Sequence, residues 1–168
     1  MSDFTNRLFV QLFKIPWIKR RWASSFVVRQ EEQKSFRRLG KPLNQCRVAL
    51  LTTGGPHLKS DPPFDMEDPQ GDGSCRSFPL DVDWNDLTIT HKYYDSKSAE
   101  RDLGVLIPIR PLQNAVASGK IGAAGPRVFS LMGHLIDEQL EHLYQVTLPR
   151  LVQGLKDDQV DCLFLAPA

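Results

Sequence analysis

The sequence has few of the features that mark several common protein classes. Its 168 residues include three cysteines, Cys46, Cys75 and Cys162, and no Cys-x-x-Cys pair. An odd number of widely spaced cysteines signals neither a disulfide framework nor a zinc site. We therefore predict no metal site and expect a reducing, cytoplasmic compartment.

Long apolar runs and a strong net charge are also missing. The most apolar opening stretch, residues 8–18, contains Lys14 and Pro16 and is much shorter than the roughly 20 apolar residues that span a bilayer. The basic residues 19–21 follow that stretch, whereas a secretory signal places them first. The formal net charge of +1 creates no overall field for nucleic acid. We predict no transmembrane segment and no nucleic-acid partner.

The charge that is present is concentrated at the amino-terminal end. Residues 1–40 hold nine basic and three acidic residues, so this arm carries about +6 and the remainder about −5. Apolar residues recur at helical spacing from Phe4 to Ile15, which predicts an amphipathic helix that Pro16 ends or kinks. Such an arm suits packing on its own domain or on a partner subunit, and it also suits a membrane surface.

The rest of the chain alternates strand-like and helix-like patterns. A helix that feeds a short apolar strand is the second half of a βαβ unit. We predict an α/β fold over residues 45–168, with an open, largely parallel sheet and helices on its faces. This domain is expected to be an incomplete half of a larger α/β domain. It is preceded by a basic amphipathic helical arm, residues 1–44. The predicted strands are residues 47–53, 87–90, 105–109, 127–131 and 161–166, and the predicted helices are residues 111–118 and 136–155. Residues 59–83, rich in Asp, Pro and Gly, are predicted to form a long loop of the kind that serves as a lid or binding loop.

The turn after the first predicted strand is the first candidate site, because ligands of open α/β sheets gather outside the carboxyl ends of the strands. Thr52, Thr53, Gly54 and Gly55 offer two hydroxyls and a glycine pair that lets the backbone approach a ligand closely. The turn is neither a GxGxxG fingerprint nor a P-loop, and a tight strand exit explains its glycines equally well. His57 is a candidate general acid or base, although a lone loop histidine is more often solvated.

A second group of polar side chains follows the predicted strand at residues 87–90. His91 and Asp95 are candidate catalytic residues, and Tyr94 is a candidate for substrate binding. Surface loops collect such residues anyway, and no metal-ligand spacing stands out. His134 follows a later predicted strand and is a further candidate for substrate binding.

Several blocks of the sequence, in a fixed order, go further than composition and spacing. They are residues 46–59 (CRVALLTTGGPHLK), 62–66 (PPFDM), 76–79 (RSFP), 90–95 (THKYYD), 107–112 (IPIRPL), 119–122 (GKIG), 129–133 (FSLMG) and 160–168 (VDCLFLAPA). Together they resemble selenoprotein B of the glycine/sarcosine/betaine/D-proline reductase family. The resemblance covers about residues 45–168.

The resemblance implies an oxidoreductase subunit in which a selenolate or thiolate attacks an activated carbon of an amino-acid derivative and is then reduced through a neighbouring thiol. In that family, the strand matching residues 161–166 leads into a motif that pairs selenocysteine or cysteine with a second cysteine. Our hypothesis is that the product continues beyond Ala168, past a UGA selenocysteine codon read as a stop. The chain itself then holds no cofactor, and a naturally shortened paralogue is the alternative.

The implied partners are other reductase subunits and a thiol reductant. Association of the chain with copies of itself, as a homo-oligomer, is a further alternative. The alternative function is a non-catalytic partner subunit or binding module that uses the basic arm. A third reading attaches the arm to a membrane surface. An exposed, apolar final strand predicts association or poor solubility unless a partner covers it.

Overall fold

The computed structural model describes residues 15, 17, 21, 38–91, 99 and 101–168. The chain divides into two units, Met1–Arg38 and Leu39–Ala168. Of the predicted amphipathic helix in the first unit, only Ile15 is among the described residues, and its side chain is exposed. The candidates Tyr94 and Asp95 lie outside the described residues.

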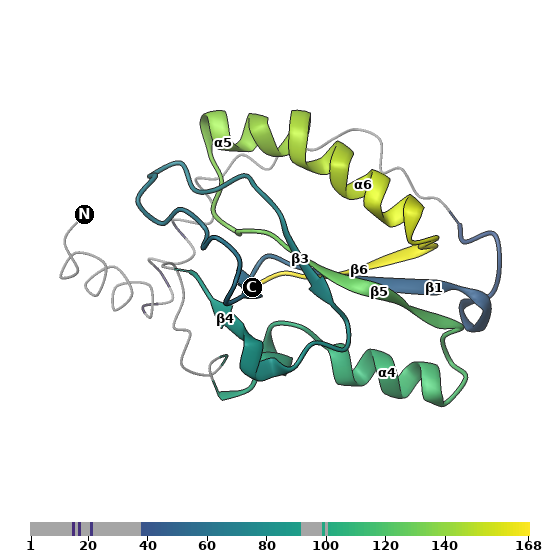
Figure 1. Cartoon of the computed structure of the whole chain (residues 1–168). Helices are drawn as coiled ribbons and strands as arrows, with labels where there is room; N and C mark the ends of the chain where they lie inside the picture. The colour runs from purple at the N-terminus through teal and green to yellow at the C-terminus, as the bar shows by residue number, and fades with distance from the viewer. Residues whose placement is uncertain (1–14, 16, 18–20, 22–37, 92–98, 100) are drawn as a thin grey trace. The chain divides into compact units, whose positions relative to one another are not determined.

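The second unit is built on a four-stranded sheet with the order β3-β5-β1-β6 (Figure 1). Strand β1 (Arg47–Thr52) pairs in parallel with β5 (Ala123–Ser130) on one side and with β6 (Cys162–Ala166) on the other. The edge strand β3 (Arg76–Pro79) is antiparallel to β5. A separate antiparallel pair joins β2 (Pro56–Leu58) to β4 (Leu87–Ile89). These pairings confirm the predicted α/β class with an open, largely parallel sheet.

Helices cover both faces of this sheet (Figure 1). Helix α4 (Ile109–Ala117) lies on one face. On the other face, α5 (Asp137–His142), the π-helical turn η4 (Leu143–Thr147) and α6 (Leu148–Asp157) follow one another without a break, which confirms the predicted long helix. The wide π turn ends two residues before Pro149, whose ring lacks an N–H and clashes with the carbonyl four residues earlier. The described part of the chain also forms the short 3₁₀ helices η1 (Leu43–Gln45), η2 (Trp84–Asp86) and η3 (Leu103–Val105).

The core lies on both sides of the sheet because β1 is apolar on both of its faces. Side chains of successive strand residues point to opposite faces. Accordingly, Leu50 belongs to the cluster beneath α4, and its neighbour Leu51 belongs to the cluster beneath α6. This two-sided burial explains why β1 reads as a continuous apolar run rather than as an alternating one.

The strand predicted at residues 105–109 is wrong. Residues Leu103–Val105 form η3, and α4 begins at Ile109. A short apolar run cannot be told from the start of a buried helix by periodicity alone. Here Pro111 sits in the first helical turn, where its missing N–H costs no hydrogen bond, and Ile109 and Leu112 bury one face of the helix.

The long loop at residues 59–83 is more ordered than its composition predicts, because it contains the edge strand β3. The Arg76 guanidinium donates hydrogen bonds to the carbonyl oxygens of Pro62 and Pro63 at 2.9 and 3.1 Å. It also lies over the ring of the buried Phe64, 4.5 Å from the ring centroid. These contacts connect β3 to the earlier part of the loop.

None of the helices among the described residues has the length and apolar character needed to cross a bilayer.

Candidate functional site

The carboxyl ends of the parallel strands meet at one edge of the sheet, where the sequence predicts a site. The register places Thr52, at the end of β1, beside Ser130 of β5 and Ala166 of β6. Thr52 and Ser130 are fully buried, each with an exposed fraction of 0%. Among the described residues, the Ser130 hydroxyl has no hydrogen-bond partner.

Both threonines of the turn use their hydroxyls within the protein. The Thr52 Oγ1 atom accepts a hydrogen bond from the Gly54 N–H at 3.1 Å. The Thr53 Oγ1 atom accepts one from the Ala168 N–H at 3.1 Å. The turn is therefore joined to the segment that follows β6, and the proposed role of these threonines in substrate binding stays a prediction.

The packing of the chain itself requires glycine at Gly55 and leaves little room for a side chain at Gly54. Gly55 has a φ of +71°, and a Cβ atom there would lie 2.5 Å from the carbonyl oxygen of Thr90. A Cβ atom on Gly54 would lie 3.0 Å from a methyl group of Leu106. A structural reason is thus established for Gly55, and the contact of either glycine with a ligand stays a prediction.

The candidate His57 is buried rather than solvated, because β2 pairs with β4 and carries it into the interior. Its Nδ1 atom is 2.8 Å from the Leu58 carbonyl oxygen, which can only accept, so Nδ1 carries the proton. In the neutral ring, the Thr90 hydroxyl then donates to Nε2, also at 2.8 Å. The ring packs edge-on against Phe64, with 5.8 Å between the centroids. Catalysis by His57 stays a prediction.

The second group of candidates is tied to the same turn. The Thr90 N–H donates to the Gly55 carbonyl oxygen at 3.1 Å, and His91 follows directly. Burial, and then the nearby His134, lower the pKa of His91 to about 4, so its imidazole is neutral at physiological pH. The structure thus brings His57, His91 and His134 to the region of the glycine turn.

Cys75 is not an activated nucleophile in this structure. Burial raises the pKa of its thiol to about 11, and the thiol donates to the carbonyl oxygen of Arg76 at 3.2 Å.

The part of the chain that the structure describes holds no group of three or more His, Cys, Asp and Glu side chains placed to bind a metal ion.

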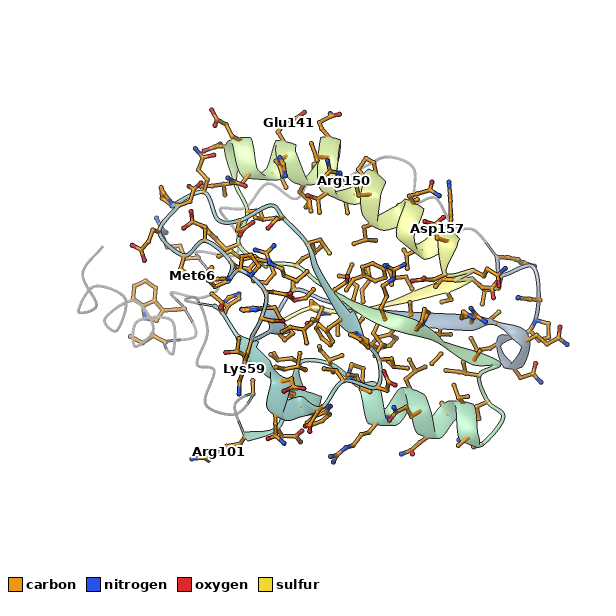
Figure 2. All side chains as sticks on the ribbon, in the orientation of Figure 1. Lys59, Met66, Arg101, Glu141, Arg150 and Asp157 are labelled. Atoms are coloured by element: carbon orange, nitrogen blue, oxygen red, sulfur yellow. The ribbon has the colours of Figure 1, made fainter. Side chains whose placement is uncertain are left out.

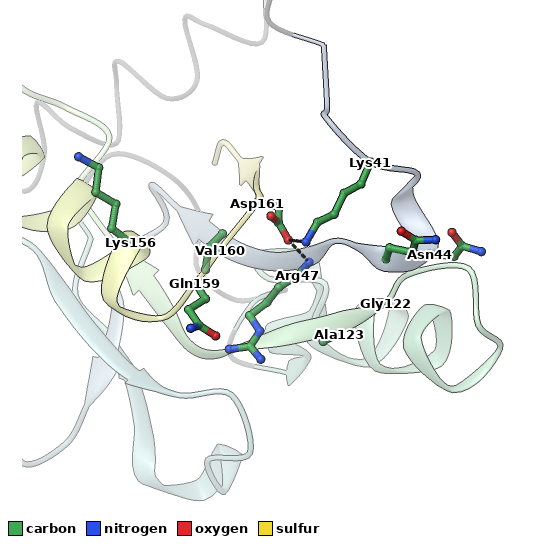
Figure 3. A pocket seen from close by; sticks show the side chains of 10 residues that line it. Lys41, Asn44, Arg47, Gly122, Ala123, Lys156, Gln159, Val160 and Asp161 are labelled. Carbon is green, nitrogen blue, oxygen red and sulfur yellow. Dashed lines mark hydrogen bonds and ion pairs between the residues drawn. The ribbon is translucent and has the colours of Figure 1, made fainter.

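A cavity of about 720 Å³ lies at the opposite, amino ends of the parallel strands (Figure 3). The Lys41 Nζ atom is 2.8 Å from Asp161 Oδ2, which also accepts the backbone N–H of Arg47 at 2.8 Å. These two contacts join the start of β1 to the start of β6. The polar residues Lys41 and Asp161 of this cavity therefore have a structural role, since they hold the two strands together.

A second cavity, of about 290 Å³, is lined by residues of β3, β5, α5 and α6. Its basic lining residues are Arg76, Arg127, His142 and Arg150. Sequence reasoning missed this group because its members come from three segments far apart in the sequence: β3, β5 and the continuous helix of α5, η4 and α6. It likewise missed Thr90 and Ser130, whose roles depend on strand register and not on local spacing.

The fold and the strand-end region define an open-sheet α/β protein with its candidate site at the carboxyl ends of parallel strands. No protein-family model matches the chain, and no solved structure matches it either. The chain is 32% identical to D-proline reductase subunit gamma of Acetoanaerobium sticklandii over 125 residues, which are 74% of this chain and 50% of that protein. The chain therefore spans half the length of this relative. The similarity supports the relationship to the reductase family that the ordered sequence blocks indicate.

Proposed function

We propose that this chain is a reductase subunit, or half of one, related to D-proline reductase and resembling selenoprotein B. The observation that carries the proposal is the 32% identity over 125 residues to D-proline reductase subunit gamma. The proposed reaction is the reductive cleavage of an amino-acid derivative by a selenolate or thiolate outside the described residues. The three free cysteines fit a reducing cytoplasm.

The strand-end region suits one wall of such a site. The Thr53 N–H donates to the Ala166 carbonyl oxygen at 3.4 Å, and the Ala168 N–H donates to the Thr53 hydroxyl at 3.1 Å. A nucleophile carried just after β6 lies beside the glycine turn in this arrangement. In our proposal, His57 and His91 move protons there, and the turn positions the substrate.

The proposed chemistry needs a reductant as well as a nucleophile. The selenolate or thiolate forms a bond to the activated carbon while the bond to the leaving group breaks, and the leaving group departs with the electron pair. A neighbouring thiolate then attacks the selenium or sulfur, and the released carbon takes a proton. A thiol reductant supplies the two electrons that reopen the resulting Se–S or S–S bond.

The exposed apolar surface of β6 favours the proposal that another polypeptide segment binds at this edge of the sheet. Strand β6 is an edge strand that pairs only with β1 among the described strands. Its neighbours Phe164 and Leu165 point to opposite faces, yet they are 52% and 61% exposed. An α/β segment that adds a strand at this edge, with helices on both faces, would cover both side chains.

The gene sequence beyond the codon for Ala168 tests the proposal. We expect a UGA codon followed by an open frame that encodes a second cysteine and a further α/β segment. A different stop codon with no coding frame after it contradicts this arrangement. Where the frame is present, replacing the selenocysteine by serine in the full product should abolish reductive cleavage, and replacing it by cysteine should leave measurable activity.

A second candidate function is a non-catalytic partner subunit or binding module. The raised pKa of Cys75, about 11, favours it because that thiol stays protonated at neutral pH. A stably folded 168-residue product that co-purifies with another subunit, and shows no reductase activity alone or in that complex, would establish this function.

A further inference from the structure

We propose that the cavity between the β3–β5 edge and the helices α5 and α6 binds a small organic anion, whose carboxylate or phosphate is recognised by Arg127, His142 and Arg150. This cavity measures about 290 Å³. It contains none of the strand-end candidates, so the inference is independent of the proposed reductase reaction.

The charge of the lining favours an anion. Three arginines and a histidine line the cavity, together with the hydroxyl-bearing side chains Ser74, Ser77 and Thr147. None of the described residues that line it is acidic. An arginine fork matches the geometry of a carboxylate or a phosphate, and each such charge-assisted hydrogen bond is stronger than a neutral one.

The three arginines differ in how many of their guanidinium N–H groups are already hydrogen-bonded within the protein. Arg76 is occupied by carbonyl oxygens of its own loop. Arg127 donates Nε and Nη2 to Asp158 at 2.5 and 2.8 Å, and its Nη1 is not used in that pair. Among the described residues, Arg150 has no ion-pair partner, and it lies on the helical layer (Figure 2). Arg150 is therefore the guanidinium that a ligand can engage in full.

The floor of the cavity is apolar, which sets the kind of anion that fits. Phe129, Leu151 and Gly154 contribute to it. A Cβ atom on Gly154 would lie 3.7 Å from the Phe129 ring, so this glycine leaves space above the ring. The volume is near the lower end of small-molecule pockets, roughly 300 Å³. A compact ligand with an apolar body and one anionic group suits this combination.

The π-helical turn η4 contributes Thr147 to the lining of the cavity. The Thr147 hydroxyl donates to the Gly73 carbonyl oxygen at 2.6 Å, which joins this turn to the long loop. Turns of this kind inside helices are frequent at functional sites. The Cys75 thiol also lines the cavity, and burial raises its pKa to about 11, so it adds no negative charge to the lining at neutral pH.

Titration of the full chain with two probe anions tests the proposal. The probes are inorganic phosphate and butyrate, and butyramide is the neutral control for the shape of butyrate. We expect saturable changes in the amide NMR signals of Leu151 and Gly154 with at least one anion and none with butyramide. Tighter binding of phosphate or of butyrate identifies which anionic group the site prefers.

Two variants separate this site from unspecific charge effects. Arg150→Gln should weaken binding about tenfold, the loss expected for one charge-assisted hydrogen bond. The matched control Lys156→Gln removes one positive charge from the same helix outside this cavity, and it should bind as the wild type does. Gly154→Leu changes no charge but fills the floor, and it should prevent binding in a protein with an unchanged circular dichroism spectrum.

The proposal is overturned if neither anion gives a saturable change. It is also overturned if Arg150→Gln binds as tightly as the wild type, or if Lys156→Gln weakens binding as much as Arg150→Gln does. A Gly154→Leu protein that keeps its circular dichroism spectrum and binds normally would also contradict it.

Discussion

At the scale of single residues, the strand-end region consists of polar groups that the chain itself engages. The imidazole of His57, the hydroxyls of Thr52 and Thr53, and the backbone of Gly55 all contact other protein atoms. Ser130 differs, because its buried hydroxyl has no partner among the described residues. A buried polar group without a partner costs free energy, so a water molecule or ligand polar atom beside Ser130 would stabilise the folded state.

Gly55→Ala should destabilise the protein by at least about 2 kcal/mol. A positive φ alone costs a non-glycine residue roughly 1–2 kcal/mol, and the added methyl group would also meet the Thr90 carbonyl oxygen at 2.5 Å. Gly119 is the matched control, because its φ is +70° and no described atom lies within 4 Å of a Cβ there. Gly119→Ala should therefore lose only about 1 kcal/mol. Urea unfolding measures both, and equal losses would refute the close contact at Gly55.

The neutral His91 predicts a loss of stability in mild acid. Its pKa is about 4 in the folded protein and about 6.5 when unfolded, so the unfolded chain binds a proton first as the pH falls. The free energy of unfolding should decrease between pH 6.5 and about 4. Asp72, Asp158 and Asp161 have pKa values lowered from 3.8, so their stabilisation is lost below that window.

Replacing His91 by Gln should flatten this part of the pH profile. Urea unfolding of the wild type and of His91→Gln at pH 7.5 and pH 5 measures the effect. A wild-type slope that persists in His91→Gln would show that another group titrates there.

At the scale of elements, β6 is buried too little for an apolar strand in an α/β sheet. Its two apolar neighbours Phe164 and Leu165 remain more than half exposed, while β1, next to it, is buried on both faces. An edge strand with exposed apolar side chains favours association with another polypeptide. Substitutions on β6 therefore test whether this edge mediates association.

Leu165→Lys should reduce self-association of the chain with little loss of stability, because the leucine is 61% exposed and a lysine can extend into water. Val105→Lys is the matched control, since Val105 is 64% exposed but lies in η3. Sedimentation velocity over a range of concentrations compares the three proteins. A monomeric wild type, or an equal effect of both substitutions, would argue against β6 as the contact.

At the scale of the whole molecule, both hydrophobic clusters found among the described residues lie in one of the two units, Leu39–Ala168. They run from Val48 to Leu163. Because apolar burial stabilises a fold, we expect this unit to fold without the preceding residues.

Deleting residues 1–38 should therefore leave the circular dichroism spectrum of the remaining unit and its unfolding midpoint almost unchanged. A large drop in the midpoint would show that the basic arm contributes to the core. Loss of co-sedimentation with anionic vesicles on deletion would assign the arm to a membrane surface, and loss of co-purification with another subunit would assign it to a partner.

Several elements could be predicted from local pattern. The apolar runs that form β1 and β6 and the helical spacing across α5 and α6 were each sufficient, because each is a property of neighbouring residues. The run at residues 105–109 misled because it is short, and because Pro108 and the following Pro111 favour a helix start. Strand β3 was hidden in a polar loop, since its pairing with β5 depends on a partner far along the chain.

The sequence by itself determined the α/β class, the positions of the apolar strands and the resemblance to a reductase family, because hydrophobic periodicity and ordered sequence blocks are local. Only the tertiary structure decided that His57 is buried against Thr90, that Gly55 packs on the same residue, and that Arg127 and Arg150 line one cavity. These facts depend on strand register and on which helix covers which face. Contacts between distant segments set both, and no spacing along the chain records them.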